Sequence, residues 1–185
     1  MNLLYRRITT VDLLVMQNIS ASGNWDNNYM FQHLYVSEKL ILDFICVFSR
    51  LEYALKVSGF ARGDSKKVTP CWDCFAKKIN DNFLKIENED LKKAVGYLLE
   101  SPPRKQILSE GKIIFQDQPV DKKQRTTQQL LLMIRRVRNN LFHGGKYCPD
   151  GEKESGRNED LLNASLIILK HCIPIHQKVN NNFHN

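Results

Sequence analysis

Residues 37–57 read SEKLILDFICVFSRLEYALKV, and the other predicted elements are arranged around this run. The run contains neither proline nor glycine. Apolar side chains surround nearly all of its first half, which is typical of a helix buried on every side. Ser37 is suited to cap its first turn, and Gly59 lies where a left-handed residue would end it. We therefore predict a central buried helix.

Further helices are expected on the C-terminal side of this one. Amphipathic spacing, capping residues and prolines set their bounds. They run from Thr69-Pro70 to about residue 81, from 88 or 89 to Pro102-Pro103, from 126 or 127 to Gly144, and from about 159 to 172, or to 176 if Pro174 only kinks the last one. In the third of these, a core stripe is formed by Leu130, Ile134, Val137 and Leu141. Four or five helices with short connections predict a bundle.

The remaining segments are assigned to arms, loops and turns. Residues 104–108 are expected to form a short helical turn, and residues 111–116 a loop or a small strand without a partner. The predicted architecture is therefore all-α: an N-terminal arm (1–30), a helical domain (31–176) and a disordered tail (177–185).

Composition and charge narrow the class of protein. With 185 residues, 42% hydrophobic and 25% charged, the chain has the composition of a globular domain and not of a disordered or fibrous one. A formal net charge of +7 favours polyanions, either nucleic acid or acidic lipid. The first twenty residues lack the apolar core of a secretory signal, and no apolar run is long enough to span a bilayer. A cytoplasmic protein without a membrane anchor is expected.

The five cysteines fit the same interpretation. Their number is odd, and Cys46 and Cys172 lie in apolar runs where a reduced thiol behaves as a small hydrophobe. Cys71 and Cys74 have CxxC spacing, which raises two alternatives. A structural zinc needs four ligands that the sequence does not provide, and a thioredoxin-like pair lacks its βαβ context. We interpret both as ordinary thiols and expect neither metal nor cofactor.

The chemistry is expected in residues 138–143, Arg-Asn-Asn-Leu-Phe-His. Arg135, Asn139 and His143 are four residues apart and follow one another along one helix face. His143 would lie in the last turn, where the negative end of the helix dipole favours imidazolium. Nearby cations suited to phosphate contact are Arg135, Arg136, Arg138 and Lys146.

These groups are what RNA cleavage without a metal requires. One group titrating near neutrality moves protons at the 2′-hydroxyl or the leaving 5′-oxygen, and a cation offsets the charge building on phosphorus. A single histidine does half of that work. A two-fold dimer that brings two copies of this helix end together would supply the missing partner.

At this point the sequence resembles a known family. The pattern Arg138-Asn139-x-x-x-His143, at the end of a long helix and followed by Gly144-Gly145, is similar to the R-polar-x(3)-H signature of HEPN ribonucleases. Residues 48–56, 59–64 and 102–108 look like a bacterial HEPN subgroup often found on plasmids or mobile elements. The resemblance extends over roughly residues 35–175.

The resemblance implies a four- or five-helix bundle that dimerises and cuts RNA without metal, leaving a cyclic phosphate. Many members are toxins or phage-defence effectors, so an antitoxin or defence-system partner is expected. By this analogy Arg138 contacts the scissile phosphate, Asn139 orients, and His143 transfers protons. Glu52 is the expected partner of Arg138.

One departure and two alternatives accompany this reading. Toxins paired with minimal nucleotidyltransferase antitoxins carry a tyrosine two residues after the histidine, where this chain has Gly145. Tyr147 lies two positions later, so it is only a supporting candidate and control by adenylylation is not expected. The alternatives are a non-catalytic RNA-, nucleotide- or partner-binding HEPN-like module, and a helix end that Arg138 and His143 merely stabilise.

Overall fold

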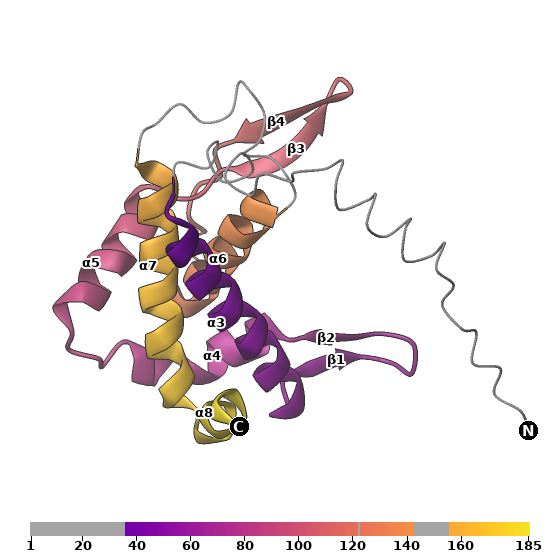
Figure 1. The fold of residues 1–185 in the computed structure, drawn as a ribbon, viewed down its shortest axis with the longest axis vertical. Helices are drawn as coiled ribbons and strands as arrows, with labels where there is room; N and C mark the ends of the chain where they lie inside the picture. Colours follow the sequence, from indigo (N-terminus) through magenta and orange to yellow (C-terminus); the bar gives the residue numbers. More distant parts are fainter. Residues whose placement is uncertain (1–35, 122, 143–155) are drawn as a thin grey trace, which may run out of the picture.

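The computed structural model describes residues 36–121, 123–142 and 156–185, and we use the element labels of Figure 1. The helices are α3 (Glu38–Val57), α4 (Trp72–Phe83), α5 (Glu89–Glu100), α6 (Thr126–Phe142), α7 (Arg157–Cys172), the 3-10 turn η1 (Ile173–Ile175) and α8 (Gln177–His184). The strands are β1 (Ala61–Gly63), β2 (Val68–Pro70), β3 (Lys105–Ser109) and β4 (Lys112–Gln116). The architecture is mostly helical, but it is not the all-α fold expected, because the strands pair into two small antiparallel sheets.

Helix α3 is the predicted central helix. The Ser37 hydroxyl accepts a hydrogen bond from the backbone of Leu40, and Gly59 has a φ of +96° just beyond the helix end. Both capping predictions are confirmed. The helix buries Phe44, Phe48 and Leu51 with three further apolar residues. In Figure 1 it runs beside α7 through the middle of the molecule, and the two helices are in contact.

The other helices pack around this pair. α5 lies against α7 on one flank, and α4 packs against α6. Asn88 caps α5 as predicted, by accepting a hydrogen bond from the backbone of Leu91. The predicted stripe of α6 is also confirmed, since its residues are 9% exposed or less: Leu130, Ile134, Val137 and Leu141. One hydrophobic core therefore joins the six helices of the described residues.

The hairpin β3–β4 replaces the short helical turn and the unpartnered strand that we expected. Residues 104–108 do not form a helix, because Lys105–Ser109 pair antiparallel with Lys112–Gln116. The two-residue turn has Glu110 at φ 49° and Gly111 at φ 75°, the left-handed pair that a tight hairpin needs. The hairpin projects at the top of Figure 1, and three of its apolar side chains are exposed: Leu108, Ile113 and Ile114.

The hairpin β1–β2 corrects the predicted start of the second helix. Thr69 and Pro70 belong to strand β2, and α4 begins at Trp72 with Cys71 as its N-cap. The exposed end of this hairpin is rich in charge, and there Gly63 comes so close to the Lys67 carbonyl that no side chain would fit. α7 likewise begins at Arg157 instead of near residue 159.

We expected a disordered tail at residues 177–185, but this prediction is wrong, because Gln177–His184 form helix α8. His176 caps this helix, and Val179 is completely buried. Asn182 donates a hydrogen bond to the Ser58 hydroxyl, and Arg50 donates one to the Phe183 carbonyl. These contacts fix α8 against α3. The expected N-terminal arm, residues 1–30, lies outside the described residues.

Candidate active site

Helix α6 presents the predicted cations because its apolar stripe faces the core. The core positions 130, 134, 137 and 141 fix the rotation of the helix about its axis. Arg135 and Asn139 consequently lie on the exposed face, and Arg136 and Arg138 lie at its half-buried borders. The three predicted arginines therefore occupy one helix, but they differ in exposure around it.

Arg138 contacts Glu52 of α3, as the sequence predicted. The Nη2 atom of Arg138 lies 3.4 Å from Oε1 of Glu52, and each side chain is 29% exposed. This distance is longer than a typical charge-assisted hydrogen bond. Because both side chains are also partly exposed to solvent, the ion pair contributes at most about 1 kcal/mol to stability. Its main consequence is that it orients the Arg138 guanidinium.

Two aromatic residues complete the surroundings of Arg138. Its guanidinium lies over the Phe48 ring, 5.1 Å from the ring centre, in cation–π geometry. The Trp72 ring lies 5.1 Å from that of Phe48, and Trp72 Nε1 donates a 3.4 Å hydrogen bond to Oε1 of Glu52. We call Phe48, Glu52, Trp72 and Arg138 the arginine cluster.

The arginine cluster joins α3, α4 and α6, and sequence reasoning found only half of it. Phe48 and Glu52 are four residues apart, which puts them on one face of α3. That spacing was an available signal for Phe48. No sequence signal pointed to Trp72. Its contact with Phe48 and Glu52 depends on where α4 begins, and we had predicted that start at Thr69-Pro70.

The arrangement leaves Arg138 able to bind an anion. A guanidinium has five N–H donors, and the described contacts engage only Nη2 with a protein oxygen. Glu52 and Phe48 hold the group in place, while its partial exposure admits a ligand. A planar donor group held in this way is suited to a phosphate.

The neighbouring side chains of α6 have separate roles. Arg136 forms no ion pair within the described residues, and burial lowers the pKa of its guanidinium. Asn139 is exposed. Asn140 is the asparagine that is buried; it donates a 2.8 Å hydrogen bond to the Arg104 carbonyl at the base of β3–β4.

Three of the predicted site residues lie outside the described residues: His143, Lys146 and Tyr147. α6 is described up to Phe142, the residue before His143. The position of His143 beside Arg138 therefore stays a prediction from the sequence.

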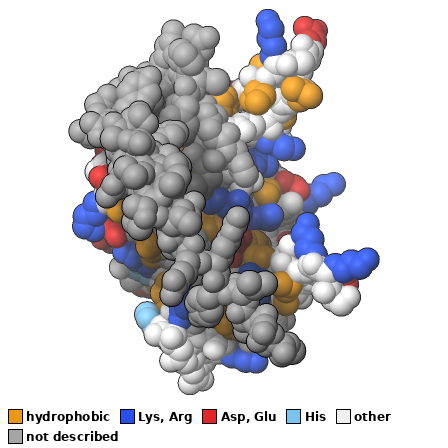
Figure 2. Space-filling model, turned by 45° about the vertical axis from the view of Figure 1, so that its right-hand side comes forward, with side chains coloured by type: hydrophobic (Ala, Val, Ile, Leu, Met, Phe, Trp, Pro, Cys, Tyr) orange, Lys and Arg blue, Asp and Glu red, His pale blue; other side chains and the backbone are white. Residues whose placement is uncertain are grey.

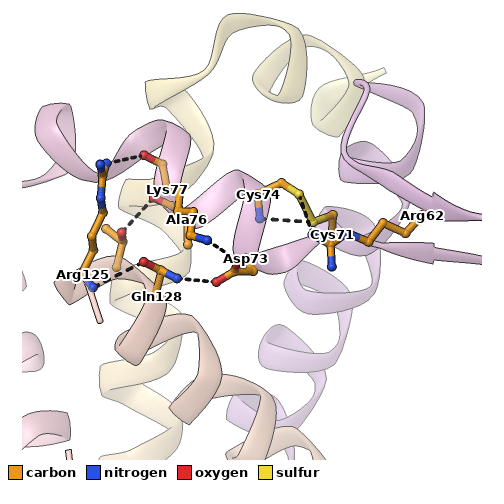
Figure 3. Close-up of polar contacts among 9 residues, drawn as sticks. Arg62, Cys71, Asp73, Cys74, Ala76, Lys77, Arg125 and Gln128 are labelled. Carbon is orange, nitrogen blue, oxygen red and sulfur yellow. Dashed lines mark hydrogen bonds and ion pairs between the residues drawn. A yellow bond between two sulfur atoms is a disulfide. The ribbon is translucent and has the colours of Figure 1, made fainter. Parts of the chain in front are cut away.

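Cys71 and Cys74 are not the ordinary thiols that we expected, because they form a disulfide. The backbone N–H of Cys74 donates to Sγ of Cys71, and Nη2 of Arg62 lies 3.3 Å from Sγ of Cys74 (Figure 3). The CxxC spacing was a signal for this pair. The odd number of cysteines in the sequence nevertheless argued against a disulfide. Across the described ranges, no group of three or more His, Cys, Asp or Glu side chains could hold a metal.

Among the described residues, exposed cations also lie on the two hairpins. Figure 2 shows Lys and Arg side chains along both of them. On β1–β2 these include Arg62, Lys66 and Lys67, and on β3–β4 Lys105 and Lys112. Strand β2 leads through Cys71 into Trp72 of the arginine cluster, whereas β3 follows the Arg104 carbonyl that Asn140 of α6 binds.

No family model, curated protein or solved structure matches the chain. Among the described helices, none is both long and apolar enough to cross a membrane.

Proposed function

We propose that the protein is an endoribonuclease of toxin or phage-defence type that acts as a cytoplasmic homodimer and needs no metal. The observation that carries the proposal is the guanidinium of Arg138, oriented by Glu52 and Phe48 and still partly exposed. It stands in the sequence Arg138-Asn139-x-x-x-His143, which resembles the HEPN ribonuclease signature. The mostly helical fold and the basic hairpins add support.

In the proposed reaction, the substrate supplies its own nucleophile. The 2′-oxygen attacks the adjacent phosphorus as a neutral imidazole of one protomer takes its proton. The bond from phosphorus to the 5′-oxygen breaks, and an imidazolium of the other protomer protonates that oxygen. The products are a 2′,3′-cyclic phosphate and a 5′-hydroxyl. Both imidazoles are His143 side chains.

The remaining residues bind and orient. Arg138 donates hydrogen bonds to the phosphate oxygens, where negative charge builds in the transition state. Glu52 and Phe48 act as positioning residues for Arg138. Arg135, Arg136 and Lys146 bind flanking phosphates, and Asn139 orients the substrate. Tyr147 is a supporting residue only, and an antitoxin or defence-system partner restrains the enzyme in the cell.

The test is cleavage of a single-stranded RNA in the presence of a chelator, beside a matched oligonucleotide with a 2′-deoxy sugar at the cut site. We expect cleavage of the RNA alone, with a cyclic phosphate detected by mass spectrometry. Binding of both oligonucleotides without cleavage of either would instead identify a non-catalytic RNA-binding module. Cleavage of the deoxy substrate would exclude attack by the 2′-oxygen.

A further inference from the structure

The disulfide at the start of α4 has two sulfur atoms in different surroundings. Cys71 is 3% exposed, and its Sγ accepts a 3.2 Å hydrogen bond from the backbone of Cys74 in the first turn of the helix. Cys74 is partly exposed, and its Sγ contacts the Arg62 guanidinium, which comes from strand β1 (Figure 3). One sulfur is therefore accessible beside a cation, and the other is shielded where it can hold negative charge.

This difference matches what thiol–disulfide exchange requires. A thiolate attacks the accessible sulfur, and the other sulfur leaves faster when its thiolate is stabilised. Arg62 attracts the incoming thiolate to Cys74. The N–H of Cys74 and the positive end of α4 stabilise the leaving thiolate of Cys71.

We propose that Cys71 and Cys74 form an exchange site for a dithiol, and that their redox state is transmitted to Arg138 through Trp72 and Glu52. The effect on RNA cleavage rests on the proposed function. The exchange chemistry and the contact with Arg138 do not.

The exchange proceeds in two steps that balance. One thiolate of the dithiol attacks Sγ of Cys74, which forms a mixed disulfide and releases Cys71 as a thiolate. The second thiol of the dithiol, once deprotonated, attacks its own partner sulfur and releases Cys74. Two electrons pass to the protein, the dithiol becomes a disulfide, and its two protons end on the cysteine thiols.

The link to Arg138 follows from the position of Trp72 inside the disulfide loop. Trp72 lies between the bonded cysteines in sequence, packs on Phe48 and donates to Glu52, which contacts Arg138. Opening the loop frees the first turn of α4 and weakens the hold of Trp72 on Glu52. The oxidised form is thus the one in which Arg138 is most firmly oriented.

The first measurement is the exchange itself. The folded protein is equilibrated with dithiothreitol or with glutathione mixtures, alkylated, and mapped by peptide mass spectrometry. We expect Cys71 and Cys74 to change together in one two-electron step, separately from Cys46 and from Cys172, whose thiol pKa burial raises. A pair that stays oxidised until the protein unfolds, or that never oxidises, overturns the exchange site.

The second measurement tests the role of Arg62. Arg62→Ala is expected to slow reduction by dithiothreitol several-fold. Lys66→Ala removes the same charge from the same hairpin without touching a sulfur, and it should leave the rate near that of wild type. Equal slowing by both variants would mean that only the overall charge of the hairpin matters, which overturns the assigned contact.

The third measurement tests the coupling without RNA. Because coupling between two sites is reciprocal, Arg138→Ala should shift the glutathione ratio at the midpoint by about two- to tenfold, the range expected for one hydrogen bond. Trp72→Phe should remove that dependence on Arg138, and Arg135→Ala, one turn away on α6, should leave the midpoint unchanged. If the glutathione ratio at the midpoint is the same in Arg138→Ala as in wild type, the coupling is overturned.

The final measurement is RNA cleavage by the oxidised and reduced protein. We expect faster cleavage by the oxidised form, with the difference abolished in Trp72→Phe. Equal rates from the two forms of an active enzyme overturn control of the site. If neither form cleaves, the proposed function fails, and the midpoint measurement alone decides the coupling.

Discussion

Arg138 is the residue that we propose both binds the substrate phosphate and stabilises the charge that builds on it. Its guanidinium is held by one carboxylate and one ring, and both contacts are weak enough for a phosphate to join them. Such a side chain contributes little to folding. Its loss should therefore separate activity from stability.

Replacing the proposed catalytic groups should abolish cleavage and spare the fold. Arg138→Ala and His143→Ala are each expected to remove activity, since proton transfer alone contributes about 10²–10⁴-fold. Asn139→Ala should cost less, because it removes an orienting contact and no proton carrier. Rates are measured on variants shown to be folded by circular dichroism, with Arg138→Lys as the charge-preserving control. Cleavage at the wild-type rate by His143→Ala would refute the assignment.

Asp73 provides a residue-scale prediction about pH. Lys77 and Gln128 both bond its carboxylate, and the Lys77 contact is the larger cause of the lowered pKa of Asp73. A lowered pKa adds stability at neutral pH that is lost as the pH falls through the pKa of the folded state. Asp73→Asn should thus lower stability by less than about 1 kcal/mol at pH 7, since the group is half exposed.

The check is thermal unfolding of both proteins across the acidic range. The gap between wild type and Asp73→Asn should close as the pH falls. Asp81→Asn removes a carboxylate from the same helix without a contact to α6, so it serves as the control. A gap that stays constant down to low pH would contradict the assigned cause.

Among the elements, the hairpin β3–β4 is linked to α6 by the buried side chain amide of Asn140. Asn140 donates to the Arg104 carbonyl at 2.8 Å. Asn140→Ala should destabilise the protein by about 1 kcal/mol, because it removes the donor of a part-buried hydrogen bond. Asn139→Ala is the matched control, since it is adjacent and exposed. Denaturant unfolding measures both, and equal effects would show that burial of Asn140 is unimportant.

The elements that the sequence predicted are those with local signals. α3 and α5 have capping side chains that bond their first turns, and α6 has an apolar stripe of helical period. These signals need no knowledge of distant residues. Arg138 was named from the motif and Glu52 from the family resemblance, although their contact spans two helices.

The elements that were missed depend on partners distant in sequence. Strand β3 contains Lys, Gln and Leu, which favour helices, and only pairing with β4 makes it extended. α8 is short and polar, and its stability comes from packing Val179 against the core. The start of α4 follows Cys71, whose bond to Cys74 also had no decisive sequence signal.

At the scale of the whole molecule, the proposed reaction needs two imidazoles, and each chain supplies one His143, so we expect a dimer. Light scattering should give twice the chain mass of 21.5 kDa under conditions in which the RNA is cut. A chain that is strictly monomeric and still cleaves at sub-micromolar concentration would contradict the two-protomer site.

The net charge of +7 predicts that RNA binding depends on salt. With the inactive His143→Ala protein, affinity should fall as salt rises, because bound cations release counterions from the RNA. Arg135→Ala should reduce the slope of log affinity against log salt by up to about 1. Lys85→Ala, which removes a cation outside α6, is the control. An RNA affinity that does not change with salt concentration would exclude the cations of α6 as the RNA site.

Under the proposed function, the attachment of α8 to α3 also affects when the growing chain can first act on RNA. Arg50 and Ser58 find their partners among residues 178–183, more than a hundred positions later in the chain. A ribosome must therefore have delivered residues 177–184 before α3, and with it the site around Glu52, is packed on all sides. For the proposed ribonuclease, this order of events would delay cleavage of the RNA that surrounds the chain during its synthesis.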